Sequence, residues 1–314
     1  MNDQPQGYDA QASWRTIQDF LPPEYRLGPG GMPVEEWWDW RGHRIHLDRF
    51  PNPDAPIRVI LFHGVGTNGR QMSTILGAPL ARSGFETVAI DMPGYGVTKV
   101  ARGVTVTYDD WVAAASDFID AELARDPRPI ILYGLSAYHA AALNRKVKGV
   151  VGMPFLAQRI RQVAAETAYN KPMSRLGMPQ VRLAARIGLG SLRMPMRLAS
   201  KMRALVNDKA AIRACYADRT SAGNWVSMAF LASYADHVPA LEPEEFDVCP
   251  ILLTQPAEDH WTPLHLSDLF LDRIGKVPVR KAMLDNAGHY PIEQPGLRQM
   301  HEAIVQFARE CVDR

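Results

Sequence analysis

Short apolar runs that end in glycine-containing turns recur through the first half of the chain. They lie at residues 57–64, 86–94, 129–134 and 147–153. Segments rich in helix-forming residues separate them, and strands that alternate with helices predict a mostly parallel sheet with helices on its faces. Two further strands are predicted late in the chain, at residues 249–255 and 279–285, and an amphipathic helix is predicted to close it.

A β-hairpin is predicted before this sheet, because the segments "EEWWDW" and "HRIHLDRF" flank the turn pair Arg41 and Gly42. The strand pattern then stops between Met153 and Cys249. Roughly ninety residues there carry helix-forming side chains interrupted by glycine and proline, which predicts several short helices. We therefore expect an α/β core formed by residues 1–153 and 246–314, with a helical cap formed by residues 154–245.

Charge and composition change this picture only locally. The 35 Lys and Arg residues balance 34 Asp and Glu residues, and the net charge of +1 gives no argument for a nucleic-acid partner. Many arginines lie between Arg159 and Arg219, so the basic character belongs to one region. The first residues lack a signal-peptide pattern, and no run reaches the ~18 apolar residues that a membrane span needs. We expect a cytoplasmic protein without a transmembrane segment.

The three cysteines are Cys215, Cys249 and Cys311. They are odd in number, widely spaced and without a CxxC pair, so neither a disulfide framework nor a zinc site is indicated. A reducing compartment fits this usage. No metal or organic cofactor is expected.

Candidate reactive groups follow the predicted strands. Ser136 follows "ILYG", Asp259 lies in "QPAEDHWTP" and His289 lies in "DNAGHYP". In open parallel sheets such loops meet at the carboxyl ends of the strands. A serine hydroxyl needs a histidine to take its proton, and a carboxylate to orient that histidine. The order Ser, Asp, His is one of the known arrangements of a catalytic triad.

The sequence resembles the α/β-hydrolase family in five segments that follow the family's order. They are "LFHGVG", "DMPGYG", "GLSA", "PAEDHWTP" and "NAGHYPIEQP". The resemblance implies that Ser136 is the nucleophile, Asp259 the acid and His289 the base. It also implies an oxyanion hole formed by the backbone N–H groups of Val65 and Ala137, each such donor being worth ~3 kcal/mol in the transition state. The cap would form a lid over the pocket.

Each of these residues also has a structural interpretation. Ser136 could cap a helix, and Asp259 could be a solvated loop carboxylate beside Glu258. The remaining candidates are expected to be structural or incidental: His63 would order its loop, Asp91 would form a turn, and His139 and His260 would lie near the site without a role. The methionines of the cap would pack its small helices, although they also suit a lipid-like pocket.

Tyr138 departs from the GxSxG pattern of the family, which has glycine at this position. Only ten residues separate Ser136 from Val147, where the next strand begins, and a parallel crossover takes about a dozen or more. About eight residues remain for the helix, or roughly 12 Å. We expect a segment shortened by about five residues beginning with two glycines, so that the Ser136 hydroxyl and the Ala137 N–H are misplaced. The ring of Tyr138 would crowd a strand or turn into the pocket.

The predicted function is a serine hydrolase that cleaves a carboxylic ester of modest size, or a monoacyl lipid, through an acyl-enzyme. The cap, being apolar and rich in arginine, would suit an amphiphile with an anionic end, or serve as the face of a homo-oligomer. A thioesterase, a carbon–carbon bond hydrolase or an aminopeptidase would use the same triad. A non-catalytic or impaired binding protein is the alternative from another class, because of the short segment after Ser136.

Overall fold

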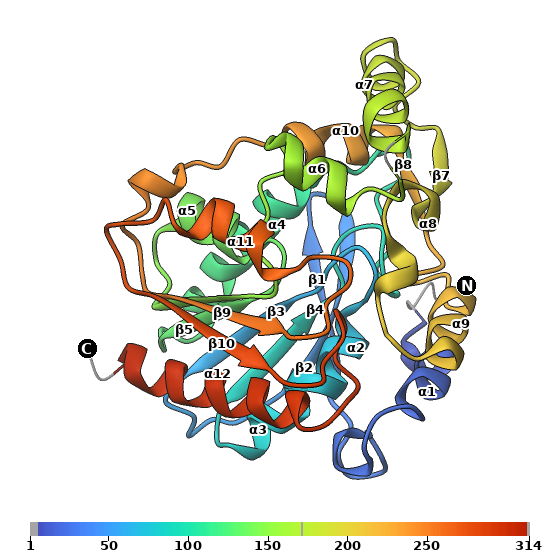
Figure 1. Ribbon diagram of the computed structural model, residues 1–314. Helices are drawn as coiled ribbons and strands as arrows, with labels where there is room; N and C mark the ends of the chain where they lie inside the picture. Colours follow the sequence, from blue (N-terminus) through green and yellow to red (C-terminus); the bar gives the residue numbers. More distant parts are fainter. Residues whose placement is uncertain (1–5, 171, 313–314) are drawn as a thin grey trace.

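The computed structural model describes residues 6–170 and 172–312. Eight strands form one sheet in the order β1-β2-β4-β3-β5-β6-β9-β10 (Figure 1). They are β1 (Val34–Trp40), β2 (His43–Phe50), β3 (Arg58–Phe62), β4 (Glu86–Ile90), β5 (Ile130–Tyr133), β6 (Gly149–Gly152), β9 (Ile251–Pro256) and β10 (Val279–Leu284). The pairs β1/β2 and β2/β4 are antiparallel and the others are parallel. The predicted hairpin and mostly parallel sheet are confirmed.

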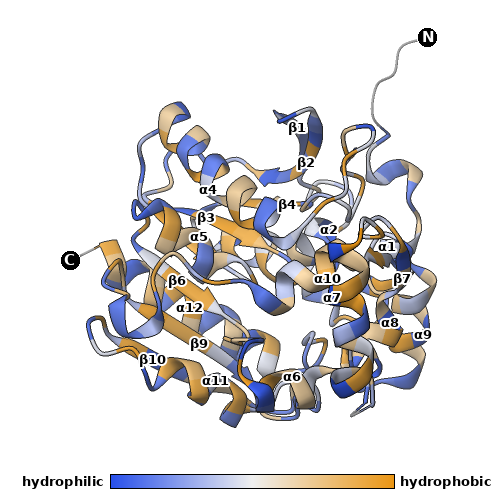
Figure 2. Ribbon diagram, turned by 90° about the horizontal axis from the view of Figure 1, so that it is seen from above, coloured by the Kyte–Doolittle hydropathy of each residue, from blue (hydrophilic) through white to orange (hydrophobic). Residues whose placement is uncertain are grey.

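The central strands are buried along their whole length because helices cover both faces of the sheet. In Figure 1, α3 (Ala78–Arg82) and α12 (Gly296–Val312) lie on one face. The other face carries α4 (Tyr108–Arg125), α5 (Ala137–Asn144) and α11 (Leu264–Leu271). Figure 2 shows the hydrophobic colour of β3, β6 and β9 at the centre of the fold. The carboxyl ends of six parallel strands therefore open toward one rim.

The N-terminal segment packs against the core. It forms a short turn at Tyr8–Ala10 and the helix α1 (Ser13–Gln18), and buries Tyr8 and Trp14. The Tyr8 hydroxyl donates a hydrogen bond of 2.9 Å to Asp91 Oδ1. The polar composition of this N-terminal segment did not predict the packing, which depends on the aromatic side chains of Tyr8 and Trp14.

Between β6 and β9 the chain forms mainly short helices, as predicted. These are α6 (Arg161–Thr167), η4 (Met173–Gly177), α7 (Met178–Arg186), α8 (Met196–Ala199), η5 (Met202–Ala204), α9 (Lys209–Ala217), α10 (Met228–Asp236) and η6 (Pro243–Glu245). Two strands that the sequence did not predict, β7 (Arg193–Pro195) and β8 (Trp225–Ser227), pair antiparallel. At three residues each, they are too short to show an alternating pattern. The remaining short elements are η2 (Pro23–Tyr25), α2 (Gly69–Met72) and η3 (Ser73–Gly77).

Candidate active site

Asp259 and His289 meet where the neighbouring strands β9 and β10 end. The two strands are parallel and paired along their full length, so the loops that follow them start side by side. His289 Nδ1 lies 2.9 Å from Asp259 Oδ2. The carboxyl group is buried and the imidazole is partly exposed. The structure thus brings together the predicted acid and the predicted base in the geometry in which a carboxylate orients a histidine.

The loop around Asp259 holds its carboxylate in the ionised form. Oδ1 accepts hydrogen bonds of 2.8 Å from the backbone N–H groups of both Trp261 and Thr262. Burial by itself would raise the pKa of Asp259, but His289 and Thr262 outweigh burial and lower it to about 2. The solvated-carboxylate interpretation of Asp259 does not fit these contacts.

Thr262 belongs to this arrangement, and sequence reasoning missed it. Its hydroxyl donates a hydrogen bond of 2.6 Å to Asp259 Oδ2 and lies 3.0 Å from His289 Nδ1. Both groups therefore share the same carboxylate oxygen. A threonine three residues after an aspartate at a loop start is a local signal for such a side-chain-to-backbone turn.

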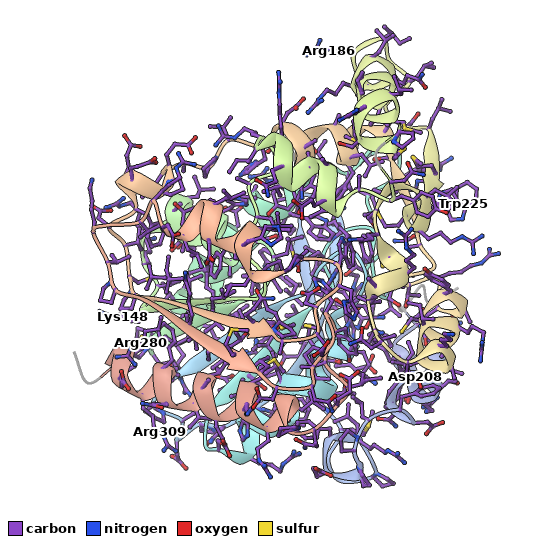
Figure 3. All side chains as sticks on the ribbon, in the orientation of Figure 1. Lys148, Arg186, Asp208, Trp225, Arg280 and Arg309 are labelled. Atoms are coloured by element: carbon purple, nitrogen blue, oxygen red, sulfur yellow. The ribbon has the colours of Figure 1, made fainter. Side chains whose placement is uncertain are left out.

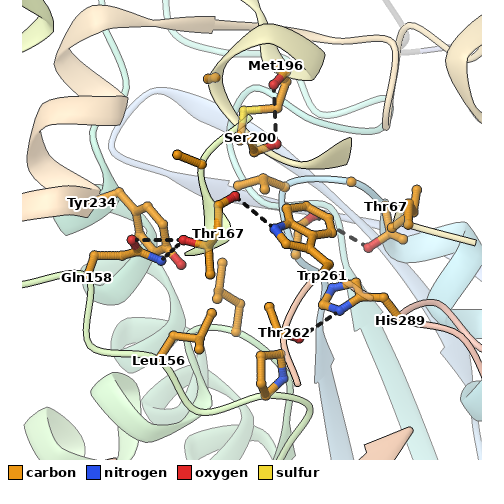
Figure 4. Close-up of a pocket in the computed structure, with 18 of the residues that line it drawn as sticks. Thr67, Leu156, Gln158, Thr167, Met196, Ser200, Tyr234, Trp261, Thr262 and His289 are labelled. Carbon is orange, nitrogen blue, oxygen red and sulfur yellow. Dashed lines mark hydrogen bonds between the residues drawn. The ribbon is translucent and has the colours of Figure 1, made fainter. Parts of the chain in front are cut away.

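His289 reaches a pocket between the sheet rim and the helices that follow β6 (Figure 4). The cavity is about 180 Å³ and its lining is mostly apolar. Four methionines line it, namely Met72, Met153, Met178 and Met196, together with Leu156, Leu205, Leu231 and Trp261. The Trp261 ring lies 4.6 Å from the His289 ring, and its Nε1 donates to the Thr167 carbonyl, which fixes this wall of the pocket.

Val65 also lines the pocket, in the loop that follows β3. No residue in the described ranges accepts a hydrogen bond from its backbone N–H. His63, two residues earlier, holds this loop: the Met92 N–H donates to Nε2 at 2.9 Å, and Nδ1 lies 2.9 Å from the Gly64 oxygen. Burial lowers the pKa of His63, so the ring is neutral. These contacts fit the expected structural role of His63.

Ser136, the predicted nucleophile, does not line this pocket. It is fully buried, and its Oγ has no hydrogen-bond partner among the described residues, His289 included. Its backbone has the relaxed values φ −88° and ψ −2° instead of the strained turn that presents a nucleophile. The hydroxyl lies close enough to that of Tyr108 to influence the pKa of this phenol. The structure therefore brings two of the three predicted residues together and leaves the third outside.

The second predicted oxyanion donor is also engaged elsewhere. The Ala137 N–H donates a hydrogen bond of 3.2 Å to the Gly134 carbonyl, closing a tight turn at the end of β5. Gly134 has φ +114°, and a Cβ there would collide with the Phe62 carbonyl oxygen. The chain therefore turns away from β5 at Gly134, and the next residue, Leu135, lines the pocket. In this conformation Ala137 offers no donor to an oxyanion.

The helix after Ser136 is as short as the spacing predicted. α5 contains eight residues and ends at Asn144, and the following residue, Arg145, has a φ of +61°. The prediction for Tyr138 is wrong, because its ring neither crowds a strand nor enters the pocket. It stacks on Phe246 at 4.6 Å and meets Phe270 edge-on at 4.7 Å. Ser136 does not cap the helix with its side chain either.

A buried polar cluster lies beside Ser136. The Tyr108 hydroxyl is 2.8 Å from His139 Nδ1, and the rings of His139 and His237 are 4.4 Å apart. Burial, with His237 and Arg159 acting in the same direction, lowers the pKa of His139 to about 3, so its ring is neutral. His139 therefore supports the helix around Ser136. His260 is exposed and has no comparable contacts within residues 6–170 and 172–312.

Asp91 is more than a turn former, because it joins several loops. It accepts hydrogen bonds from the N–H groups of Gly69 and Val97, at 2.7 and 3.0 Å, besides the bond from Tyr8. Nearby, Glu35, His46 and Asp48 could together surround a metal ion. Arg70 fills this position instead, with hydrogen bonds of 2.6 and 2.9 Å to Asp48 and of 2.8 Å to Glu35. We assign this cluster a structural role.

Comparisons with known proteins agree with this architecture. A soluble variant of monoglyceride lipase from Saccharomyces cerevisiae, solved with a substrate analog, is similar with a TM-score of 0.72 and 15% identity, over 93% of this chain and 98% of that chain. The monoacylglycerol lipase of Paleococcus ferrophilus has a TM-score of 0.63 and 18% identity, over 85% and 99%. Est1E from Butyrivibrio proteoclasticus, with ferulic acid bound, has a TM-score of 0.58 and 16% identity, over 89% and 100%.

These identities are low, so the three structures establish a shared fold and nothing finer. No curated protein matches the sequence significantly. The model of the alpha/beta hydrolase family, however, matches residues 59–298, which include β3, Ser136, Asp259 and His289. The chain belongs to the alpha/beta hydrolase family.

Proposed function

We propose that the protein is a carboxylic-ester hydrolase of the Ser-His-Asp type whose nucleophile is withdrawn in the conformation described. The observation that carries this proposal is the pairing of Asp259 with His289 at the wall of an apolar pocket, at 2.9 Å. The carboxylate already accepts hydrogen bonds from its own loop, so the geometry of this loop does not account for the histidine beside it. The unpaired Val65 N–H supplies one oxyanion donor.

In the productive state the Ser136 hydroxyl must reach the free nitrogen, Nε2, of His289. The oxygen then attacks the ester carbonyl while His289 takes its proton. Collapse of the tetrahedral intermediate breaks the C–O bond, and His289 returns the proton to the leaving alcohol. Water repeats the sequence on the acyl-enzyme and releases the acid and Ser136. Because Ser136 starts outside the pocket, we expect this reaction to be slow.

The substrate we propose is an uncharged ester with an apolar acyl group. Arg182 is the single Lys or Arg residue among those that line the cavity, and its guanidinium is paired with Asp236 at 2.7 Å. An anionic ligand would therefore compete with a carboxylate that is already in place. This pairing argues against the anionic amphiphile expected from the arginine content of the cap.

A fluorophosphonate probe tests the proposal. We expect slow labelling that disappears both in Ser136→Ala and in His289→Gln, together with slow hydrolysis of short and medium-chain p-nitrophenyl esters. Labelling that persists at the same rate in Ser136→Ala would contradict the assignment of the nucleophile.

A second candidate function is binding without turnover. The observation that favours it is the Ala137 N–H, which is bonded to Gly134 and is not available to an oxyanion. A fluorescent fatty-acid ester separates the two functions. Saturable binding that survives in Ser136→Ala, with no labelling of the parent protein by the probe, would support the binding protein.

A further inference from the structure

One segment of the chain concentrates positive charge to an unusual degree. Residues 167–207 contain no Asp or Glu and eight basic residues: Lys171, Arg175, Arg182, Arg186, Arg193, Arg197, Lys201 and Arg203. The net charge of the whole chain is +1, so all residues outside this segment together carry −7. The charge is therefore divided between a basic pole and an acidic remainder.

The same segment exposes large apolar side chains. Leu183 and Ile187, four residues apart in and just after α7, are 57% and 61% exposed, and Leu176 before them is 67% exposed. Further exposed apolar residues on the neighbouring turns and on β8 are Leu189, Leu192, Leu198 and Trp225. We call these seven residues the apolar face of the cap. Scattered exposed apolar residues are ordinary, but a concentration of them is not. Six of these seven lie in the basic segment, and Trp225 lies on β8, which pairs with β7 of that segment.

The α7 end of the apolar face projects away from the sheet, and Trp225 lies lower, at the right-hand edge of the molecule in Figure 3. In Figure 1, α7 stands above the rest of the fold, and in Figure 3 the side chains of Arg186 and Trp225 point outward from its edge. Among the described residues, Arg186 and Arg193 have no acidic partner, whereas Arg182 on the inner side is paired. Unpaired cations thus flank exposed leucines.

We infer that the cap docks on an anionic phospholipid surface through its apolar face and the arginines around it. An amphipathic helix with arginine beside leucine and tryptophan lies in the plane of a membrane interface, with its apolar side chains among the acyl chains. Tryptophan favours the headgroup level. The acidic remainder of the chain is repelled by an anionic surface, so the charge division orients the molecule with the cap toward the lipid.

A second copy of the chain fits this face less well. An isologous dimer through α7 would bring two arginine-rich surfaces together, and residues 167–207 offer no carboxylate to either. Met178 and Arg182 of α7, together with Ser174 of the preceding η4, line the pocket. A bilayer would therefore lie within one helix diameter of the pocket. The docking inference does not depend on whether the pocket catalyses a reaction.

Flotation with phosphatidylcholine vesicles, with and without phosphatidylserine, tests the inference. We expect binding to the anionic vesicles that weakens as salt is raised. The double variant Arg186→Gln with Arg193→Gln should bind roughly ten- to thirtyfold more weakly, since each basic residue near an anionic surface contributes about 1 kcal/mol. Leu183→Asp with Ile187→Asp should reduce binding at least tenfold. Circular dichroism and thermal unfolding show whether the variants remain folded.

Matched controls lie on the far side of the molecule. Arg309 is exposed near the end of α12, opposite α7 in Figure 3, and Met283 is 46% exposed on β10. Arg309→Gln and Met283→Asp should bind vesicles like the parent protein. Equal loss in the controls, no binding to anionic vesicles, or equal binding to neutral vesicles would overturn the inference. The inference would also be overturned if the parent protein were a dimer that dissociates on Leu183→Asp with Ile187→Asp. Tight binding of the parent to duplex DNA, retained in this double variant, would overturn it as well.

Discussion

The loops at the ends of β9 and β10 and the loop at the end of β5 belong to the same sheet but differ in how completely they build a site. At the ends of β9 and β10, the carboxylate of Asp259 takes part in four hydrogen bonds, to Trp261, twice to Thr262, and to His289 at 2.9 Å. At the end of β5, the Ser136 hydroxyl has no hydrogen-bond partner in the described part of the chain, and the Ala137 N–H is bonded to Gly134. One loop is complete and the other leaves a buried polar group unsatisfied.

The difference shows how local each half of the site is. The Asp259 carboxylate accepts hydrogen bonds from Trp261 and Thr262, within four residues, and the Glu258 N–H donates to the Ala287 carbonyl in the loop after β10. Short-range bonds and one adjacent loop therefore hold its geometry. The turn at Ser136 depends on the length of the crossover that follows, because α5 must return to β6 within a fixed number of residues. A short crossover would therefore displace the proposed nucleophile, Ser136, and leave the proposed acid and base in place.

The largest expected effect comes from restoring that length. Five residues beginning with two glycines, inserted between Ala137 and Tyr138, should raise kcat/KM for an ester at least roughly a thousandfold, because loss of a working triad serine costs even more. Steady-state hydrolysis of p-nitrophenyl butyrate measures the gain. The same insertion in Ser136→Ala should be inactive, and an equal insertion at the exposed loop around Gly103 should change nothing. An inserted protein that remains as slow as the parent would show that length is not the defect.

Tyr138→Ala should destabilise the protein by about 3 to 5 kcal/mol, since it empties the space between Phe246 and Phe270. Tyr138→Phe should cost only about 1 kcal/mol, for the lost hydrogen bond to the Leu241 carbonyl. Urea unfolding measures both. Similar losses in the two variants would mean that the ring packing is not what stabilises this helix.

Asp259→Asn should lower the free energy of unfolding by about 2 to 3 kcal/mol, because a charged acceptor of several hydrogen bonds is replaced. Glu258→Gln, at the exposed neighbouring position, should stay within about 0.5 kcal/mol of the parent. The pair distinguishes a structural carboxylate from a solvated one. Equal changes in the free energy of unfolding for the two variants would mean that Asp259 is a solvated carboxylate.

The low pKa of Asp259 gives a pH dependence of defined sign. Its folded pKa is about 2, below the ordinary value near 4, so the carboxylate stabilises the folded state above pH ~4. That contribution is lost as the pH falls from about 4 to 2. The difference in unfolding free energy between the parent protein and Asp259→Asn should therefore shrink toward zero as the pH falls through this window. A constant difference would contradict the sign.

The smallest effect is expected at the nucleophile position. Ser136→Ala should leave stability unchanged or raise it by up to about 1 kcal/mol, because it removes a buried hydroxyl without a partner. Ser227→Ala is the matched contrast, since the Ser227 hydroxyl accepts a hydrogen bond of 3.0 Å from the Phe230 N–H at a helix start. That variant should lose about 1 kcal/mol. Thermal unfolding of the two side by side decides the matter.

Sequence alone predicted the sheet, the hairpin and the helical insertion, because each follows from local alternation and turn residues. It also placed Asp259 and His289 after neighbouring strands. It could not predict where Tyr138 packs, since its partners Phe246 and Phe270 lie more than a hundred residues away. The position of the Ser136 hydroxyl outside the pocket agrees with the misplacement expected from the short crossover, but its nearness to Tyr108 could not be predicted.

The N-terminal arm has a consequence for the order of folding. Gln11 Nε2 donates hydrogen bonds to Asp218 and Thr220, which lie 207 and 209 residues further along the chain. During synthesis, Gln11 must therefore wait for roughly two hundred further residues before it finds these partners. We expect an affinity tag fused directly before this arm to hinder that late contact more than the same tag fused after α12.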